Sequence, residues 1–373
     1  MSAPSIFDGA LILGGGPAGA AAAIQLARAG RAVQVWEREP HPVHRPCCGV
    51  LSPTAQKILS NQGIDLNELS AASAAFLHIV TDSGARRVPL GLEARMLTRH
   101  RLDAALLDRA QEAGADVRRG VVFRGIGEDG AVLSGHGALR PATLLVATGL
   151  EGAPGLLAPP ILRDNRIAFQ SLWRLRPAAR TACQGQIEWL LFDGGYALLH
   201  LVEREAASLC VIVSSARLAT VGGGFQALIA AIAAEVPLLA QRLEGAVPLV
   251  NRPRILDGLP LPGFYRPDAD TLRQVWRVGE QVARLPPGIG DGLGLALLGA
   301  RMTVRALLTG ETPLICQRRI VRHSRSVMRH SIWLDKHLPQ NAAGRRAMLR
   351  LMNVPGIAPL ATRLTRLKAP GGI

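Results

Sequence analysis

Residues 8–37 read DGALILGGGPAGAAAAIQLARAGRAVQVWE, and this stretch decides the fold. The apolar run at residues 8–13 predicts a buried strand, and the Ala-rich run at 18–29 predicts a helix. Residues 32–36 predict a second strand, which ends on Glu37. A G-x-G-x-x-G motif lies between the first strand and the helix. Strand, glycine-rich turn, helix, strand and acid, in this order, are typical of a dinucleotide-binding βαβ unit.

Each glycine of this motif has a physical task. Gly14 permits the tight turn, Gly16 lets the backbone approach a pyrophosphate, and Gly19 lets the helix pack closely on the strand. The helix N-terminus offers free N–H groups and partial positive charge to phosphates. Glu37 can accept hydrogen bonds from ribose hydroxyls. We therefore predict a bound dinucleotide; the alternative is a glycine-rich turn without a ligand, and this motif alone does not decide between FAD and NAD.

Length and composition set bounds on the class of protein. A chain of 373 residues suits two domains, or one interrupted by another, and 48% hydrophobic residues are enough for a core. No run of 18 apolar residues lacks charges or helix breakers, and the N-terminus shows no secretory signal pattern, so we expect no membrane-spanning helix. The five cysteines have neither zinc spacing nor a disulfide framework, which predicts no metal site and a cytoplasmic location.

Positive charge is concentrated at the C-terminal end. Residues 316–373 hold twelve Lys or Arg and one acid, Asp335, so they carry +11 of the net charge of +15. Two helical stripes stand out, one basic (Arg318, Arg322, Arg325, Arg329) and one apolar (Ile357, Leu360, Leu364, Leu367). The pattern fits a helix on an anionic membrane surface, a docking site for an acidic protein partner, or a solvated face packed on the body. Nucleic acid is not expected, because no nucleic-acid motif accompanies the charge.

The remaining elements suggest an α/β domain interrupted by a sheet. Four strand-like runs at near-regular spacing between residues 167 and 214 predict an antiparallel sheet. Helices are expected in the C-terminal region, broken at Pro339, Pro355 and Pro359. The other predicted elements are helices at residues 52–62, 99–114, 225–243 and 295–308, a hairpin at 75–89 and strands at 143–149 and 274–278.

Five segments together resemble the FAD-dependent oxidoreductases that include the aromatic-ring hydroxylases (class A flavoprotein monooxygenases) and the geranylgeranyl-reductase-like flavoproteins. The segments are the glycine motif at 14–37, CGVLSP at 48–53, LTRHRLD at 97–103, LVATG at 145–149, and VGE at 278–280 with the loop PPGIGDGLG at 286–294. The order and separation of the segments carry the resemblance.

The resemblance implies a Rossmann-like FAD-binding domain of the glutathione-reductase type, interrupted by an antiparallel β-sheet substrate domain and followed by a basic helical C-terminal region. The FAD-binding domain would comprise residues 1–75, 96–158 and 256–315. The substrate domain would comprise residues 76–95 and 159–255, and the C-terminal region residues 316–373.

The resemblance also implies a set of cofactor-binding residues. Arg99 would contact the FAD phosphates or ribityl chain, and the loop at 288–294 would bring N–H groups to the flavin N1/C2=O edge. Two residues depart from the family pattern: Glu280 stands where an Asp is usual, and Thr148 stands where the family has an acid. The full implied set is Gly14, Gly16, Pro17, Ala18, Gly19, Glu37, Arg38, Arg45, Cys48, Gly49, Arg99, Gly149, Glu280, Pro287, Gly288, Gly290, Gly292, Leu293 and Gly294.

Three side chains are catalytic candidates. By the resemblance, Cys48 lies beside the flavin ring, where a thiol could tune the ring or donate a proton, or merely pack on it. Tyr196 and His200 lie four residues apart on a predicted strand, so they share one face. They could orient a phenol or amide, or form a structural pair.

The resemblance implies an FAD-dependent monooxygenase that hydroxylates an aromatic or apolar substrate, a small molecule or a peptide side chain, through a flavin hydroperoxide. One fingerprint leaves no second nucleotide domain, so NAD(P)H would bind transiently or a separate flavin reductase would supply electrons. One alternative is a geranylgeranyl-reductase-like double-bond reductase of a lipid substrate, peripheral at the membrane. Another is a flavoprotein maturation factor that docks on an acidic partner protein.

Overall fold

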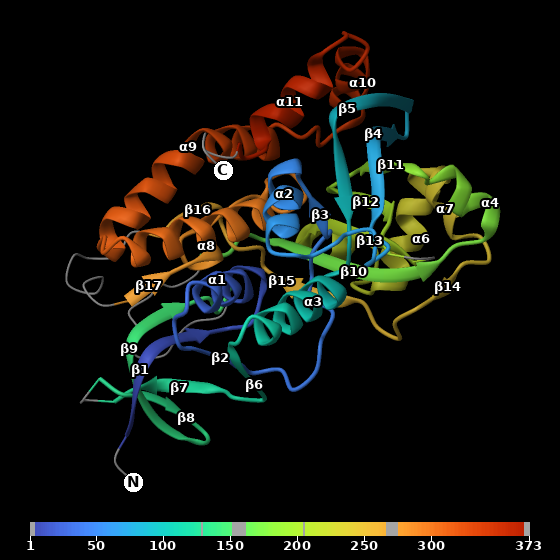
Figure 1. Ribbon diagram of the computed structural model, residues 1–373. Coiled ribbons are helices and arrows are strands. Elements are labelled where there is room, and N and C mark those ends of the chain that lie inside the picture. The colour runs from blue at the N-terminus through green and yellow to red at the C-terminus, as the bar shows by residue number, and fades with distance from the viewer. Residues whose placement is uncertain (1–3, 128–129, 151–161, 204–205, 266–274, 369–373) are drawn as a thin grey trace.

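The computed structural model describes residues 4–127, 130–150, 162–203, 206–265 and 275–368. The chain forms two large sheets, with helices packed on each and three further helices at the C-terminal end (Figure 1). The sheets meet at a cavity, and the loops that line it come from both.

The first sheet contains the predicted βαβ unit. Strand β1 (Ser5–Leu13) leads into helix α1 (Pro17–Arg28), and β2 (Val33–Glu37) pairs with β1 in parallel. The strand order is β6-β2-β1-β9-β8-β7, and β17 also pairs with β9. The other strands are β6 (Asp116–Arg119), β7 (Phe123–Ile126), β8 (Val132–Ser134), β9 (Gly137–Val146) and β17 (Val275–Arg277).

Three helices pack together beside this sheet and form the main core. Helix α1 lies between α3 (Arg99–Glu112) and α8 (Gly292–Leu308). Helix α2 (Pro53–Asn61) begins at Ser52, whose hydroxyl accepts a hydrogen bond from Ala55 N, as the sequence predicts for a cap. The predicted helix at 295–308 begins three residues earlier, because Asp291 caps it with its side chain.

The second sheet has the strand order β14-β10-β13-β12-β11-β4-β5-β3, and β15 pairs with β10. The four strands predicted between residues 167 and 214 are antiparallel to one another, but β11 pairs with β4 in parallel, so the sheet is mixed. The strands are β3 (Val50–Leu51), β4 (Ala72–Thr81), β5 (Gly84–Met96), β10 (Arg166–Arg174), β11 (Gly185–Phe192), β12 (Gly195–Leu201), β13 (Ala206–Ser214), β14 (Val247–Pro248) and β15 (Arg254–Asp257).

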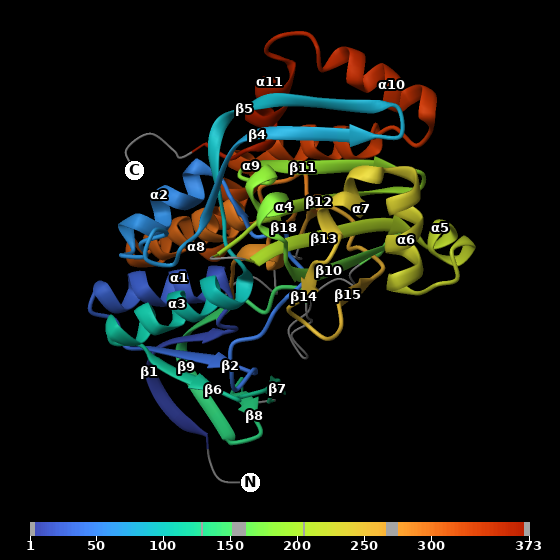
Figure 2. The same ribbon diagram turned by 90° about the vertical axis from the view of Figure 1, so that its right-hand side faces the viewer.

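Helices α4 (Pro177–Ala182), α6 (Phe225–Glu235) and α7 (Pro237–Leu243) cover one face of this sheet, and α5 (Ser215–Thr220) lies at its edge (Figure 2). The single helix predicted at 225–243 is wrong. Pro237 has no N–H to continue the helical ladder, so the chain breaks at Val236 and a new helix begins.

The predicted domain boundaries stay a prediction, but the strands show where the chain crosses between sheets. Strand β4 begins at Ala72, before the predicted boundary at 75/76. Strand β15 runs to Asp257, past the predicted boundary at 255/256, while it pairs with β10. The boundary at 158/159 lies outside the described residues.

The C-terminal region forms α9 (Pro313–Lys336), α10 (Ala342–Leu351) and α11 (Ile357–Thr365). In Figure 2, α10 and α11 lie over the β4–β5 hairpin. Asp335 on α9 forms a two-point ion pair with Arg166 on β10, with both N···O distances 2.9 Å. Pro339 and Pro355 lie between helices, but Pro359 lies in the first turn of α11, where its missing N–H would have no helical acceptor.

Candidate functional site

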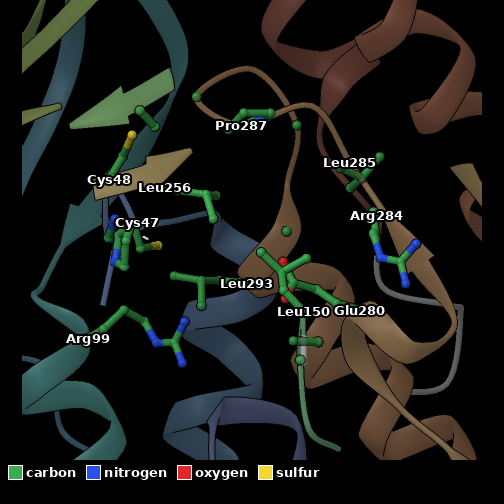
Figure 3. A pocket seen from close by; sticks show the side chains of 18 of the residues that line it. Cys47, Cys48, Arg99, Leu150, Leu256, Glu280, Arg284, Leu285, Pro287 and Leu293 are labelled. Carbon is green, nitrogen blue, oxygen red and sulfur yellow. Dashed lines mark hydrogen bonds between the residues drawn. The ribbon is translucent and has the colours of Figure 1, made fainter. Parts of the chain in front are cut away.

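A cavity of about 250 Å³ lies between the two sheets. Its walls come from the glycine turn before α1, the loop at 46–50, the loop at 284–293, and strands β10 and β13 of the second sheet. Figure 3 shows Cys48 on one side with Pro287 across from it, and Arg99 and Glu280 further along.

The glycine turn is shaped as its motif requires. Gly14 has a φ of 101°, and a Cβ there would lie 2.6 Å from the carbonyl oxygen of Ala147. A Cβ on Gly19 would lie 1.9 Å from the carbonyl oxygen of Gly14, so only glycine lets α1 pack on this turn. Gly16 caps the helix, which has no acid in its first turn and no side-chain cap. The free N–H groups of this helix start therefore face the cavity.

Arg99 brings a cation to the same helix start. Its Nη2 lies 3.4 Å from the position of a Cβ on Gly16, and its Nε and Nη2 donate to Asp103 at 2.7 and 2.8 Å. Burial lowers the pKa of Arg99, but the Asp103 carboxylate more than offsets this, and the net shift is upward. A permanent cation beside free N–H groups suits a pyrophosphate.

Glu37 lies in a second, smaller hollow with Arg45. Its Oε2 accepts from Gly15 N at 2.7 Å, and its Oε1 accepts from Glu39 N at 3.0 Å. Arg45 Nη2 lies 3.4 Å from the same Oε1. The carboxylate is thus held in place at the end of β2, where an adenosine ribose would lie in a dinucleotide site.

The late glycine loop ends at the start of α8. Asp291 accepts from Gly294 N at 3.1 Å, while the N–H groups of Gly292 and Leu293 have no acceptor among the described residues. This second helix start also points free donors into the cavity. The loop therefore fits a group that carries negative charge or carbonyl oxygens.

The loop at 46–50 places thiols in the cavity wall. Cys47 and Cys48 line it, as does Cys210 from β13. The neighbouring Cys210 thiol and burial raise the pKa of Cys48 well above its usual value, and burial raises the pKa of Cys47. At neutral pH both therefore remain thiols, which suits packing or proton donation rather than nucleophilic attack.

Strand β12 connects to both loops that flank the cavity. The Tyr196 hydroxyl donates to the carbonyl oxygen of Pro287 at 2.8 Å. The His200 Nε2 donates to the carbonyl oxygen of Cys48, also at 2.8 Å. As predicted, the two side chains share a face, but neither lines the cavity. Each supports a loop that does, and their predicted catalytic role stays a prediction.

Burial keeps His200 neutral. Its side chain is fully buried, its Nδ1 has no hydrogen-bond partner, and desolvation lowers its pKa to about 4. Burial also raises the pKa of Tyr196 well above its usual value, so its hydroxyl stays protonated. Both groups therefore act as fixed hydrogen-bond donors.

Glu280 faces the open cavity next to Gly149, with its Oε2 3.3 Å from the position of a Cβ there. The surrounding protein limits hydration of this carboxyl and so raises its pKa, although Arg99 and Arg284 lower it in part. The carboxylate thus lines the cavity, as the resemblance implies for a cofactor-binding residue.

The structure brings most predicted cofactor residues together. Gly14, Gly19 and Gly294 shape the backbone behind the cavity, and Arg38 lies at the surface after β2. The residues that line the main cavity are Gly16, Pro17, Ala18, Cys48, Gly49, Arg99, Gly149, Glu280, Pro287, Gly288, Gly290, Gly292 and Leu293.

Sequence reasoning missed Arg366 as a site residue. Arg366 lines the cavity although it follows α11 in the basic tail. Its sequence neighbours suggested an exposed helix face. One sequence signal was available: Leu367, next to Arg366, continues the apolar stripe. In the structure Leu367 is buried beyond the end of the helix, while Leu360 and Leu364 are exposed.

Residues 9–136 match a family model described as an FAD binding domain. No curated protein sequence matches the chain.

Solved structures with the same fold cover nearly the whole chain. A myxobacterial chondrochloren halogenase has a TM-score of 0.75 at 18% identity, over 94% of this chain and 90% of its own. The flavin-dependent brominase Bmp2 has a TM-score of 0.73 at 17% identity, over 96% and 98%. PqsL of Pseudomonas aeruginosa in complex with 2-aminobenzoylacetate has a TM-score of 0.71 at 17% identity, over 93% of this chain and 100% of its own. PqsL is a probable FAD-dependent monooxygenase.

The family match identifies FAD as the cofactor, and the similar solved structures show the fold of the whole chain. The two free helix starts, the cation at Arg99 and the close glycine contacts fit FAD. Residues 9–136 therefore form an FAD-binding domain, and the chain is similar in fold to flavin-dependent halogenases and to PqsL, a probable FAD-dependent monooxygenase.

Proposed function

We propose that this enzyme is an FAD-dependent monooxygenase that hydroxylates an aromatic or otherwise apolar substrate. The observation that carries the proposal is the wall that the second sheet contributes to the cavity. This wall is almost wholly apolar, and its polar side chains are Gln170 and the Cys210 thiol. The residues of the wall are Ala168, Phe169, Gln170, Cys210, Val211, Ile212, Leu256, Leu259 and Pro260. An apolar pocket with few polar groups favours a flat, uncharged substrate.

FAD supplies the redox chemistry and the activation of O₂ when it is bound. The chain binds it through the α1 start and Arg99, and the α8 start faces the other end of the cavity. Gln170 donates to Ser208 at 3.4 Å, which fixes its amide and leaves the carbonyl oxygen to orient a substrate hydroxyl or amine. The apolar wall keeps water from the reacting atoms.

The electron source would be NAD(P)H bound transiently, or a separate flavin reductase. The described chain has one βαβ unit with a dinucleotide turn, and that unit faces the FAD cavity. A reductant would therefore have to reach the ring through the open cavity rather than from a second nucleotide domain.

We further propose that the exposed basic face of α9 docks on an anionic membrane surface, which would place the enzyme at the membrane periphery. This face carries four exposed arginines, Arg318, Arg322, Arg325 and Arg329. The one acid on this helix, Asp335, forms an ion pair with Arg166 and so does not neutralise them. Trp333 continues the same face and is 58% exposed. Cations beside an exposed indole suit an anionic lipid headgroup layer. Among the described helices, none has the length and hydropathy to cross a membrane.

The test is substrate-dependent consumption of O₂ by the FAD-loaded enzyme. With phenols, indoles, anilines and aromatic peptides, NAD(P)H and a general flavin reductase, we expect a product heavier by one oxygen atom, with ¹⁸O incorporated from ¹⁸O₂. Parallel reactions with NaCl or NaBr, and anaerobic reactions with a polyprenyl alcohol, test other outcomes. A halide-dependent product would show halogenation, and an anaerobic gain of two hydrogens would show double-bond reduction; either would overturn the proposal. Turnover only on a copurified acidic protein would favour the maturation factor instead.

A further inference from the structure

The C-terminal segment after α11 is fastened to two parts of the FAD-binding domain and to helix α9. Leu367 N donates to Asp291 Oδ2 at 3.1 Å, and the Thr54 hydroxyl donates to the carbonyl oxygen of Leu367 at 2.7 Å. His323 Nε2 lies 2.8 Å from the carbonyl oxygen of Lys368. The segment thus joins the loop before α8, the first turn of α2 and helix α9, and Leu367 is buried in the main core.

This segment places an arginine in the wall of the cavity. Arg366 Nη1 donates to the carbonyl oxygen of Ile289 at 2.6 Å and to the hydroxyl of Thr365 at 3.1 Å. Among the described residues, its Nε and Nη2 make no hydrogen bond, and no carboxylate forms an ion pair with it. The guanidinium therefore holds unused donors beside the cavity.

Nearby acid does not neutralise this cation. Among the residues that the structure describes, Asp291 is the one carboxylate that raises the pKa of Arg366, and burial outweighs it and lowers that pKa. The two Asp291 oxygens already accept from Gly294 N and Leu367 N. Arginine stays charged despite such a shift. A partly buried cation without a counter-ion is costly, so a ligand that brings negative charge would relieve this cost.

The free donors of the α8 start lie on the same side of the cavity. Arg366 bonds to Ile289, and the unpaired N–H groups belong to Gly292 and Leu293. Two independent sources of positive potential, a helix start and a half-buried guanidinium, therefore converge at one end of the loop.

We propose that Arg366 joins the start of α8, where the resemblance already implies contact with the flavin N1/C2=O edge, as a second group that binds this edge, so that the C-terminal region completes the cofactor site. The proposal rests on the FAD-dependent function proposed above. Reduction of the ring places negative charge on this edge, so the cation stabilises the reduced form more than the oxidised form. Arg366 is then a positioning residue that both tightens FAD and raises its midpoint potential.

The experiment compares three variants of the full chain, each assayed for FAD affinity and for midpoint potential. Arg366→Gln removes the charge, and Arg366→Lys keeps it. Arg363→Gln is the matched control: it is one turn away, exposed, and loses the same charge outside the cavity. We expect Arg366→Gln to bind FAD roughly tenfold more weakly or worse, as loss of a charge-assisted hydrogen bond predicts. Its potential should shift to more negative values, Arg366→Lys should retain most of the wild-type potential, and Arg363→Gln should match the wild type.

The wild type provides a measurement that does not depend on any variant folding. Its bound FAD should have a more positive midpoint potential than free FAD. A wild-type potential at or below that of free FAD, or an Arg366→Gln protein with unchanged affinity and potential, would overturn the inference while leaving the FAD-dependent function intact. A wild-type protein that binds no FAD would instead remove the proposed function.

Discussion

A neutral histidine held in the core makes the stability of this enzyme depend on pH. His200 has a pKa of about 4 in the folded protein, well below the value of about 6.5 expected when unfolded. Between these values the unfolded chain binds more protons, so stability is fully present above pH 6.5 and falls as the pH drops toward 4. At pH 5 the loss from this one residue is about 2 kcal/mol.

We therefore expect His200→Gln to lose less stability than the wild type on acidification. The glutamine amide can still donate to the carbonyl oxygen of Cys48 but cannot take up a proton. Urea unfolding at pH 7 and pH 5 measures the difference between the two proteins. His44, whose pKa is also lowered by burial, is present in both and cancels. An equal loss in the two proteins would show that His200 is not buried as a neutral group.

Some residues could be assigned from sequence and others could not, for a physical reason. The glycines at 14, 16 and 19 have tasks that depend on local chain geometry, which the sequence pattern carries. Tyr196 and His200 could be placed on one strand face by period two, but their partners, the carbonyl oxygens of Pro287 and Cys48, are distant in sequence. Backbone acceptors leave no signal in side-chain patterns, so the supporting position of these residues was not predictable.

At the scale of elements, helix α9 presents the surface that we propose for an anionic membrane. Replacing Arg322, Arg325 and Arg329 with Gln should weaken binding to vesicles of mixed phosphatidylglycerol and phosphatidylcholine roughly 100-fold, at about 1 kcal/mol per cation. Vesicle co-sedimentation at low salt measures this, and 0.5 M NaCl should abolish wild-type binding.

A matched variant separates surface position from net charge. Replacing Arg31, Arg124 and Arg252 with Gln removes the same charge from exposed sites outside the C-terminal region. This variant should bind vesicles like the wild type. If both triple variants weaken alike, or the wild type binds neutral vesicles equally well, the basic face has no special part; capture of an acidic protein with no vesicle binding would point to a protein partner.

Helix and strand boundaries were predictable where a local signal exists. Ser52 and Pro53 marked the start of α2, and residues 82–84 marked the turn of the β4–β5 hairpin. The parallel pairing of β4 with β11 was not predictable, because it joins residues more than a hundred positions apart. Pro237 and Pro359 show the converse difficulty: both lie in the first turn of a helix, but Pro237 follows directly on another helix and separates the two, whereas Pro359 interrupts none.

At the scale of the whole molecule, the C-terminal helices are part of the folded body rather than an appended tail. Ile320, Val327 and Met328 of α9 belong to the same core as α1 and α8. The Asp335–Arg166 ion pair ties α9 to the second sheet, and the Asp335 side chain is only 7% exposed. We therefore expect a single unfolding transition that releases FAD and loses helical signal together.

Breaking this ion pair should destabilise the whole chain. We expect Asp335→Asn to lower the free energy of unfolding by about 2 kcal/mol, because the partly buried Arg166 loses its two-point partner but keeps Asp164. Asp108→Asn is the control, since its pair with Arg119 is exposed and should cost less than about 1 kcal/mol. Urea unfolding followed by circular dichroism and by flavin fluorescence measures both. A tail that melts first, at an unchanged midpoint for the rest, would contradict this picture.

Strand β12 holds both loops that flank the cavity, because Tyr196 and His200 donate to the backbone of one loop each. Tyr196 and His200 are four positions apart, and an extended strand advances about 13 Å over that interval. The separation of the two loops should therefore follow the geometry of this strand as well as that of the loops themselves. Widening the cavity for a bulkier substrate would therefore require a change in the length or bend of this strand in addition to new loops.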